Sequence, residues 1–210
     1  MGPATTDDSS FELLETLRWT PDEGFYLLNR HLSRLEASAR HFGFPCRLHD
    51  VRGALQGVSA TAERPTKVRV LVSRDGIVRV ERAPIEPTPT PLRVGLAARP
   101  INPANPFLFH KTTNRTEQER ERSPNYDEMV LWNPDRDITE AMAANIVVDL
   151  GNRSATPPAE CGLLAGTMRA ELLARGEICE ERISIDQLVR APRFWLINSV
   201  RGWRPAILAR

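Results

Sequence analysis

The sequence predicts an α+β fold of two subdomains, and three features support this prediction. The first part of the chain holds paired runs of alternating apolar and polar residues, typical of β-hairpins, with an amphipathic helix between them. Residues 84–91 are then rich in proline, which removes backbone donors and stiffens the chain. The remainder mixes further strands with short helices. We therefore expect a small N-terminal subdomain over residues 1–83, a linker over 84–91 and a larger subdomain over 92–210.

We expect residues 1–10 to be poorly ordered because they are small and polar. Asn29 is a candidate N-cap for the amphipathic helix, and Gly43 is expected to end it. The Arg-Asp-Gly sequence at 74–76 predicts a hairpin turn. The expected elements are strands over 11–19, 25–28, 67–73 and 77–82, and helices over 30–42 and 49–57.

The second part is expected to contain a charge-dense, solvated helix over 114–123 and further helices after Thr167 and over 186–190. A short extended piece is closed by Thr156 and two prolines. The expected strands are 92–98, 129–132, 144–150, 183–185 and 194–197.

The composition argues against several classes of protein. The chain has 210 residues, 41% apolar and 26% charged, which suffices for a buried core. A net charge of +1 gives no electrostatic basis for a nucleic-acid or membrane partner. Charged residues interrupt every apolar run well before the ~20 residues of a membrane span, and no charged-then-apolar leader opens the chain. We expect a cytoplasmic protein with free thiols at Cys46, Cys161 and Cys179, whose spacing does not suit a metal.

The stretch from 137 to 169 carries the clearest chemical pattern. Gly162 and Gly166 lie in a loop that runs into a helix near Thr167, and such a helix N-terminus offers backbone N–H groups to a phosphate. Glu140, at the mouth of an apolar strand, is suited to hold a nitrogen heterocycle in its protonated form. A phosphate at one end and a pyridinium at the other describe pyridoxal phosphate.

Pyridoxal phosphate needs a lysine for covalent attachment, and the sequence offers few. Of the 28 basic residues only Lys67 and Lys111 are lysines, and arginine stays protonated. Lys67 opens an alternating run and is expected at a solvated strand end. Lys111 lies between apolar residues and hydroxyls, so we expect Lys111 to carry the cofactor.

Several motifs together resemble the fold-type IV pyridoxal-phosphate enzymes. This group includes branched-chain aminotransferases, D-amino acid aminotransferases and 4-amino-4-deoxychorismate lyases, and the resemblance covers about residues 11–208. The fold it implies is of the D-amino acid aminotransferase type, with the cofactor between the two subdomains. The motifs are HLSRLEAS (31–38), HKTTNR (110–115), ITEAMAANIVV (138–148), TPP (156–158), LLAGTMR (163–169) and NSVRG (198–202).

The resemblance implies further site residues. It assigns Arg34, Thr167 and Ser199, with the N–H groups of Gly166 and Thr167, to the cofactor phosphate. Thr16 matches a threonine that the lyases place near the reacting carbon, although an ordinary strand threonine fits equally well.

Two departures from the family pattern bear on the subfamily. Met168 stands where the transaminases usually have threonine, which favours the lyases. Gln118 or a neighbour stands where members of the fused lyase-like subfamily tend to have a tyrosine.

The resemblance is greatest to the lyases and to the lyase-like domain fused to aminodeoxychorismate synthase. It implies cleavage of the small-molecule substrate 4-amino-4-deoxychorismate to 4-aminobenzoate and pyruvate in folate biosynthesis. Candidates for its carboxylates are Arg18, Arg115 and Arg201. The alternatives are an aminotransferase for branched-chain or D-amino acids and a non-catalytic module derived from the enzyme.

The resemblance also implies a homodimer and an association with aminodeoxychorismate synthase. The usual first strand of the free-standing members is missing or replaced by residues 1–10, so one edge of the site is expected to be incomplete or to be supplied by a partner.

Overall fold

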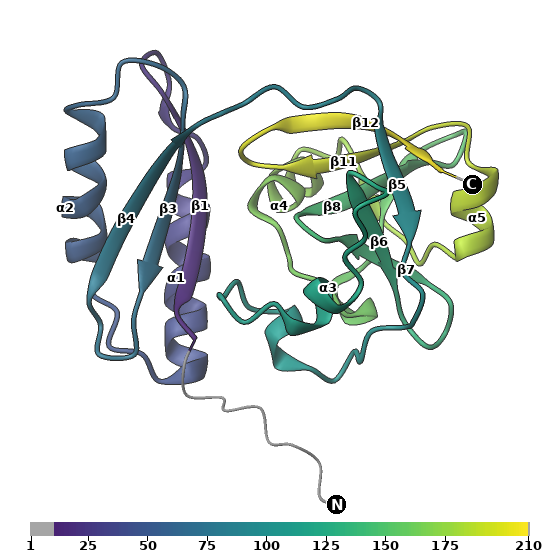
Figure 1. Cartoon of the computed structure of the whole chain (residues 1–210), viewed down its shortest axis with the longest axis horizontal. Helices are drawn as coiled ribbons and strands as arrows, with labels where there is room; N and C mark the ends of the chain where they lie inside the picture. Colours follow the sequence, from purple (N-terminus) through teal and green to yellow (C-terminus); the bar gives the residue numbers. More distant parts are fainter. Residues whose placement is uncertain (1–10, 210) are drawn as a thin grey trace, which may run out of the picture. The chain divides into compact units, whose positions relative to one another are not determined.

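The computed structural model describes residues 11–209, so the expectation of disorder over 1–10 lies outside the described part. Within it the chain forms two compact units (Figure 1). The first contains residues up to Pro84 together with Lys111–Asn114, and the second contains Ile85–His110 and Arg115 onward. The short segment Lys111–Asn114 therefore belongs to the first unit, although it lies far from the rest of that unit in the sequence.

The first unit is a four-stranded sheet of order β2-β1-β3-β4 with two helices. All strand pairs are antiparallel, and α1 packs on β1 while α2 packs on β4. Alternate residues of β1 and β3 are buried, as expected of a sheet with one covered face. The elements are β1 (Leu13–Thr20), β2 (Gly24–Phe25), α1 (Leu28–Phe42), α2 (Leu48–Ser59), β3 (Thr66–Val72) and β4 (Val78–Pro84).

The expected hairpins and both helices of this unit are confirmed, but the strand expected over 25–28 is only Gly24–Phe25, and the N-cap of α1 is not Asn29. The helix begins at Leu28, and Leu27 caps it with a left-handed φ of 54° and no side-chain hydrogen bond. Asn29 instead accepts a hydrogen bond from Arg52 at 3.4 Å. Gly43 ends the helix in the left-handed conformation (φ 68°), as predicted.

The second unit is built around a closed sheet. The strand order β8-β11-β12-β5-β6-β7 closes on itself because β7 also pairs with β8, and β9 and β10 extend it from β8. Its main core lies among these strands and includes Val94, Val130, Ile146 and Leu196, each fully buried. The strands are β5 (Leu92–Leu96), β6 (Glu128–Trp132), β7 (Ile138–Ala141), β8 (Ala144–Asp149), β9 (Ser154–Thr156), β10 (Cys179–Glu180), β11 (Phe194–Asn198) and β12 (Gly202–Leu208).

Helices lie between and around these strands (Figure 1). The helix α4 packs on β11, and α5 adds Ile185 and Leu188 to the core. The helical elements are the 3-10 turns η1 (Pro106–Leu108) and η2 (Ala159–Cys161), and α3 (Thr116–Arg120), α4 (Thr167–Ala174) and α5 (Ile185–Arg190).

Two expectations for this unit are corrected. Residues 183–185 do not form a strand, because Ser184 caps α5 through a capping box with Gln187. The helix expected over 114–123 is only Thr116–Arg120, and it is not fully solvated, since Gln118 is buried. The strand β12 was not predicted; it contains Pro205, and its pairing with β5 starts just beyond, at Ala206.

In the described part of the chain, no helix combines the length and apolar character needed to cross a membrane. The three cysteines are free thiols, as expected.

Candidate active site

The first unit holds a buried carboxylate between two basic side chains. Glu15 lies on β1 with 2% exposure, on the face covered by α1. Arg34 of α1 donates from Nε to Oε1 at 2.8 Å and from Nη2 to Oε2 at 2.7 Å, which is the bidentate geometry favoured by guanidinium and carboxylate groups. His31, one turn earlier on α1, places Nδ1 2.7 Å from Oε2. Glu15 thus orients Arg34, the arginine for which the family resemblance implies a contact with the phosphate.

The charges of this cluster follow from its surroundings. Burial by itself raises the pKa of Glu15, but the charge and hydrogen bonds of Arg34 and the hydrogen bond with His31 outweigh it and hold the pKa at about 2. Burial lowers the pKa of His31, an effect that Glu15 opposes and that Arg34 and Lys111 reinforce. An ionised carboxylate only accepts, so neutral His31 donates from Nδ1 and carries its proton there.

Lys111 lies in the segment that joins the first unit. Its carbonyl accepts from the N–H of Leu14 at 2.9 Å, and Thr112 forms a bridge with Leu13, so the segment runs antiparallel beside β1. The charge of Lys111 contributes to the lowered pKa of His31. Lys67, the other lysine, lies on β3 opposite Arg18 of β1.

Thr16 follows Glu15 on β1 and so points to the opposite face of the sheet. It is half-buried and lies opposite Arg69 of β3. Within the first unit, Thr16 therefore does not belong to the Glu15 cluster, although the two residues are adjacent in the sequence.

In the second unit, Glu140 is buried on β7 with 6% exposure. Its Oε2 accepts from the N–H of Leu164 at 3.1 Å, and its Oε1 lies 3.4 Å from Nε2 of Gln118. Two donors from separate segments therefore hold the carboxylate. Gln118 or a neighbour stands where members of the fused lyase-like subfamily tend to have a tyrosine. The contact of the buried Gln118 side chain with Glu140 was not predicted.

The loop from 162 to 166 leads into α4 as predicted. Gly166 is the N-cap, and Thr167 and Met168 are buried in the first turn. A Cβ at Gly166 would overlap Oδ1 of Asn145, whose Nδ2 donates to the carbonyl of Leu164 at 2.8 Å. Only glycine leaves room for this close approach.

Arg169 contacts the segment of two prolines that follows Thr156. The Arg169 side chain is almost fully buried, and Nη2 donates to the carbonyl of Pro157 at 2.8 Å and to the carboxylate of Glu180. The first turn of α4 is thereby tied to the segment that follows β9.

Ser199 is buried just beyond β11, in a turn that Asn198 organises. Oδ1 of Asn198 accepts from the N–H groups of Val200 at 3.1 Å and Arg201 at 2.8 Å. These two contacts fix the turn that contains Ser199.

The three arginines proposed for substrate carboxylates all have protein partners. Arg18 pairs with Glu23 at 3.3 Å and lies over the ring of Tyr26. Arg115 donates to the carbonyl of Met142, and Arg201 donates to that of Glu86 at 2.5 Å. Each would have to keep or exchange these contacts to bind a substrate.

Among residues 11–209 the structure brings together no set of three or more His, Cys, Asp or Glu side chains suited to a metal. Sequence reasoning missed Glu15, Gln118 and Asn145. The signal for Glu15 was a charged residue at a position that shares its strand face with the apolar Leu13, Leu17 and Trp19, whereas nothing local marks the other two.

The chain resembles known proteins along most of its length. Residues 12–208 match the model of the Amino-transferase class IV family. The chain is 31% identical over 196 residues to "Putative aminodeoxychorismate lyase" of Schizosaccharomyces pombe, which covers 86% of this chain and 83% of that protein.

Solved structures show the same fold. A "Putative amino-acid aminotransferase" from Mesorhizobium loti has a TM-score of 0.88 and 35% identity, covering 95% of this chain and 100% of the other. The 4-amino-4-deoxychorismate lyase from Pseudomonas aeruginosa has a TM-score of 0.80 at 23% identity, covering 94% and 82%.

Fold and sequence together define a two-unit enzyme that uses pyridoxal phosphate. The chain belongs to the class IV aminotransferase family. The alternative of a non-catalytic module is therefore set aside.

Proposed function

We propose that this enzyme is a lyase that converts 4-amino-4-deoxychorismate to 4-aminobenzoate and pyruvate. The observation that carries the proposal is the 31% identity to the Schizosaccharomyces pombe protein named as such a lyase. Met168 in the first turn of α4 and Thr16 on β1 support it, because both follow the lyase pattern rather than the transaminase pattern.

The side chains present suit pyridoxal phosphate. In the second unit, Glu140 is an ionisable group held by two donors, and the N-terminus of α4 offers backbone N–H groups suited to an oxyanion. We propose that Glu140 holds the ring nitrogen and that Gly166, Thr167 and Ser199 bind the phosphate. In the first unit, we propose that Arg34 adds a charged donor for the phosphate and that Lys111 attaches the cofactor.

When bound, pyridoxal phosphate supplies a ring that accepts electrons from the carbon beside the substrate amine. Lys111 would hold the cofactor and, as a free amine, would take the proton from that carbon. Glu140 would keep the ring nitrogen protonated. Thr16 would orient the substrate or relay a proton to its enolpyruvyl group, which would leave as pyruvate while the remaining ring becomes aromatic.

The attachment of the cofactor can be tested directly. Borohydride reduction of the loaded enzyme and peptide mapping should place the label on Lys111, and Lys111→Ala should abolish turnover while the protein stays folded. Label on Lys67, or no label, would contradict the proposed role.

A second candidate function is an aminotransferase, favoured by the 35% identity to the Mesorhizobium loti protein. The two are separated by incubating the enzyme with aminodeoxychorismate, and separately with branched-chain or D-amino acids plus 2-oxoglutarate. Formation of 4-aminobenzoate and pyruvate without glutamate supports the lyase. Rapid glutamate formation without 4-aminobenzoate would identify the aminotransferase.

The proposal includes a cytoplasmic location, a homodimer and an association with aminodeoxychorismate synthase. The cytoplasmic location follows from the composition, and the two assemblies follow from the family resemblance.

A further inference from the structure

The segment that carries Lys111 is held on the first unit by a short set of contacts. Residues Lys111–Asn114 belong to this unit, while His110 and Arg115 belong to the other. The position of the Lys111 backbone therefore depends on how firmly this segment is bound to β1 and the residues before it.

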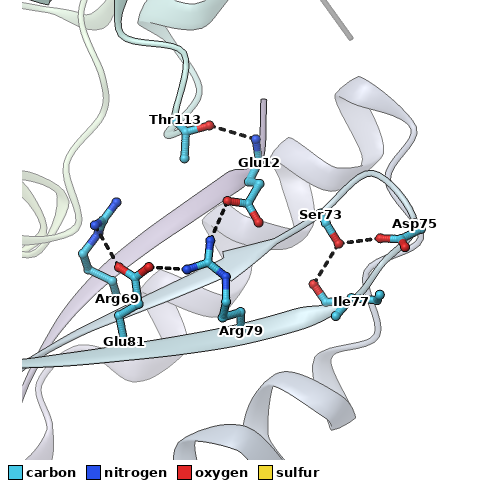
Figure 2. Close-up of polar contacts among 8 residues, drawn as sticks. All are labelled: Glu12, Arg69, Ser73, Asp75, Ile77, Arg79, Glu81 and Thr113. Carbon is cyan, nitrogen blue, oxygen red and sulfur yellow. Dashed lines mark hydrogen bonds and ion pairs between the residues drawn. The ribbon is translucent and has the colours of Figure 1, made fainter. Parts of the chain in front are cut away.

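Three hydrogen bonds join the segment to the start of β1. The N–H of Leu14 donates to the carbonyl of Lys111, and the N–H of Thr113 donates to the carbonyl of Glu12, both at 2.9 Å. Any residue could make these two backbone contacts. The third requires a side chain, because the N–H of Glu12 donates to Oγ1 of Thr113 at 2.9 Å (Figure 2). Thr113 thus accepts one hydrogen bond from Glu12 through its hydroxyl and donates another to Glu12 through its backbone N–H.

The side chain of Glu12 makes a separate contact that does not involve Thr113. Arg79 of β4 donates to its Oε2 at 2.9 Å and also pairs with Glu81, which accepts from Arg69 at 2.9 Å (Figure 2). Arg79 is 52% exposed, so solvent screens these ion pairs and each is worth little alone. They limit the motion of Glu12, but they do not touch the Lys111 segment.

We infer that Thr113 is a positioning residue for Lys111, an inference that rests on the proposed attachment of the cofactor to Lys111. Its hydroxyl fixes the register of the segment, and neighbours two apart in an extended segment share a face, so Lys111 and Thr113 lie on the same side. The burial agrees, because Thr112 between them is 1% exposed whereas both neighbours are half-buried. Loss of the hydroxyl leaves the Glu12 N–H to water and broadens the range of positions open to the Lys111 amine.

The test compares Thr113→Val, which removes the hydroxyl at nearly constant shape, with Thr113→Ser, which keeps it. Ser73→Ala is the matched control, since Ser73 bonds only within the hairpin turn to Asp75 and Ile77 among the contacts drawn in Figure 2. Amide exchange is measured at Glu12 in the cofactor-free protein. The pH midpoint of the visible absorbance is measured in the loaded enzyme.

Thr113→Val should speed exchange at Glu12 by roughly 2- to 10-fold, the effect of one lost hydrogen bond. It should also shift the absorbance midpoint, because the Lys111 amine changes its distance from the charges around Glu15. Thr113→Ser should leave both values close to those of the unaltered protein, and Ser73→Ala should change neither. Thr113→Ala removes the same hydroxyl without adding bulk and carries the same expectation if the valine variant does not fold.

Two failures can be told apart. Unchanged exchange and an unchanged midpoint in the valine and alanine variants, with Lys111 still labelled by borohydride, would overturn the role of Thr113. Absence of label from Lys111 in the unaltered enzyme would instead overturn the proposed function.

Discussion

Glu15 is a buried carboxylate that stays ionised because two side chains of α1 surround it. Burial alone disfavours an ionised carboxylate, but the contacts with Arg34 and His31 offset this cost and fix the position of the Glu15 side chain. The motif HLSRLEAS (31–38) contains His31 and Arg34 but not Glu15, so it indicates only part of the cluster.

The pH dependence of stability should report this cluster. The pKa of Glu15 is about 2 in the folded protein against an ordinary value of 4.5, so its stabilising effect is complete above pH 4.5 and is lost as the pH falls toward 2. The loss is on the order of 3 kcal/mol. Glu15→Gln should remove this part of the acid dependence of the free energy of unfolding, measured with denaturant across that range.

Two details sharpen this measurement. The lowered pKa of His31 acts in the same direction, with stability falling below pH 6.5, so the comparison belongs below pH 4.5. Glu36→Gln, at an exposed position of α1, is the control and should leave the curve unchanged. Parallel curves for Glu15→Gln and the unaltered protein would show that Glu15 does not titrate as described.

Arg34→Ala should weaken cofactor affinity by about 1.5–3 kcal/mol, the range for a hydrogen bond to a charged group. It also leaves Glu15 with a weaker partner, so stability without cofactor must be measured alongside. Arg40→Ala, on the exposed side of the same helix, is the control for the loss of a positive charge. Equal cofactor affinity in both variants would return Arg34 to a purely structural role.

At the scale of elements, the start of α4 depends on a contact between distant segments. Gly166 closely approaches Asn145 of β8, and Asn145 in turn holds the carbonyl of Leu164. This contact holds the loop and α4 against the closed sheet, or barrel, of the second unit. It lies next to the N–H of Leu164, which donates to Glu140.

Gly166→Ala should destabilise the protein by about 1–3 kcal/mol, because an added methyl group overlaps Asn145. The cost should be smaller in an Asn145→Ala background, where the overlap is relieved, and a double-mutant cycle of unfolding free energies measures the difference. Gly151→Ala, where a Cβ would meet no atom within 4 Å, reports the cost of a positive φ (92°) alone. Additive effects of the 166 and 145 substitutions would contradict the contact.

At the scale of the whole molecule, we predict a homodimer. The family resemblance places such sites near a subunit boundary. Sedimentation at several protein concentrations should give the mass of a dimer, with activity falling as dimers dissociate on dilution. A monomer that keeps full activity at every concentration would refute the prediction.

The sequence by itself determined much of this protein. Periodicity and turn residues predicted most strands and the helices α1, α2 and α4, because a half-buried strand or helix repeats its own pattern locally. The scarcity of lysine and the glycine loop before Thr167 predicted the chemistry, since both are local properties of the chain.

Only the tertiary structure decided which distant residues meet. It assigned Lys111–Asn114 to the first unit, placed Glu15 against Arg34 and Gln118 against Glu140, and closed the barrel through β7 and the unpredicted β12. These contacts join segments separated by many residues, and they form because buried polar groups must find partners wherever the fold brings them. Local sequence pattern carries no record of such pairings, which is why the neighbours of the site residues emerged only from the folded chain.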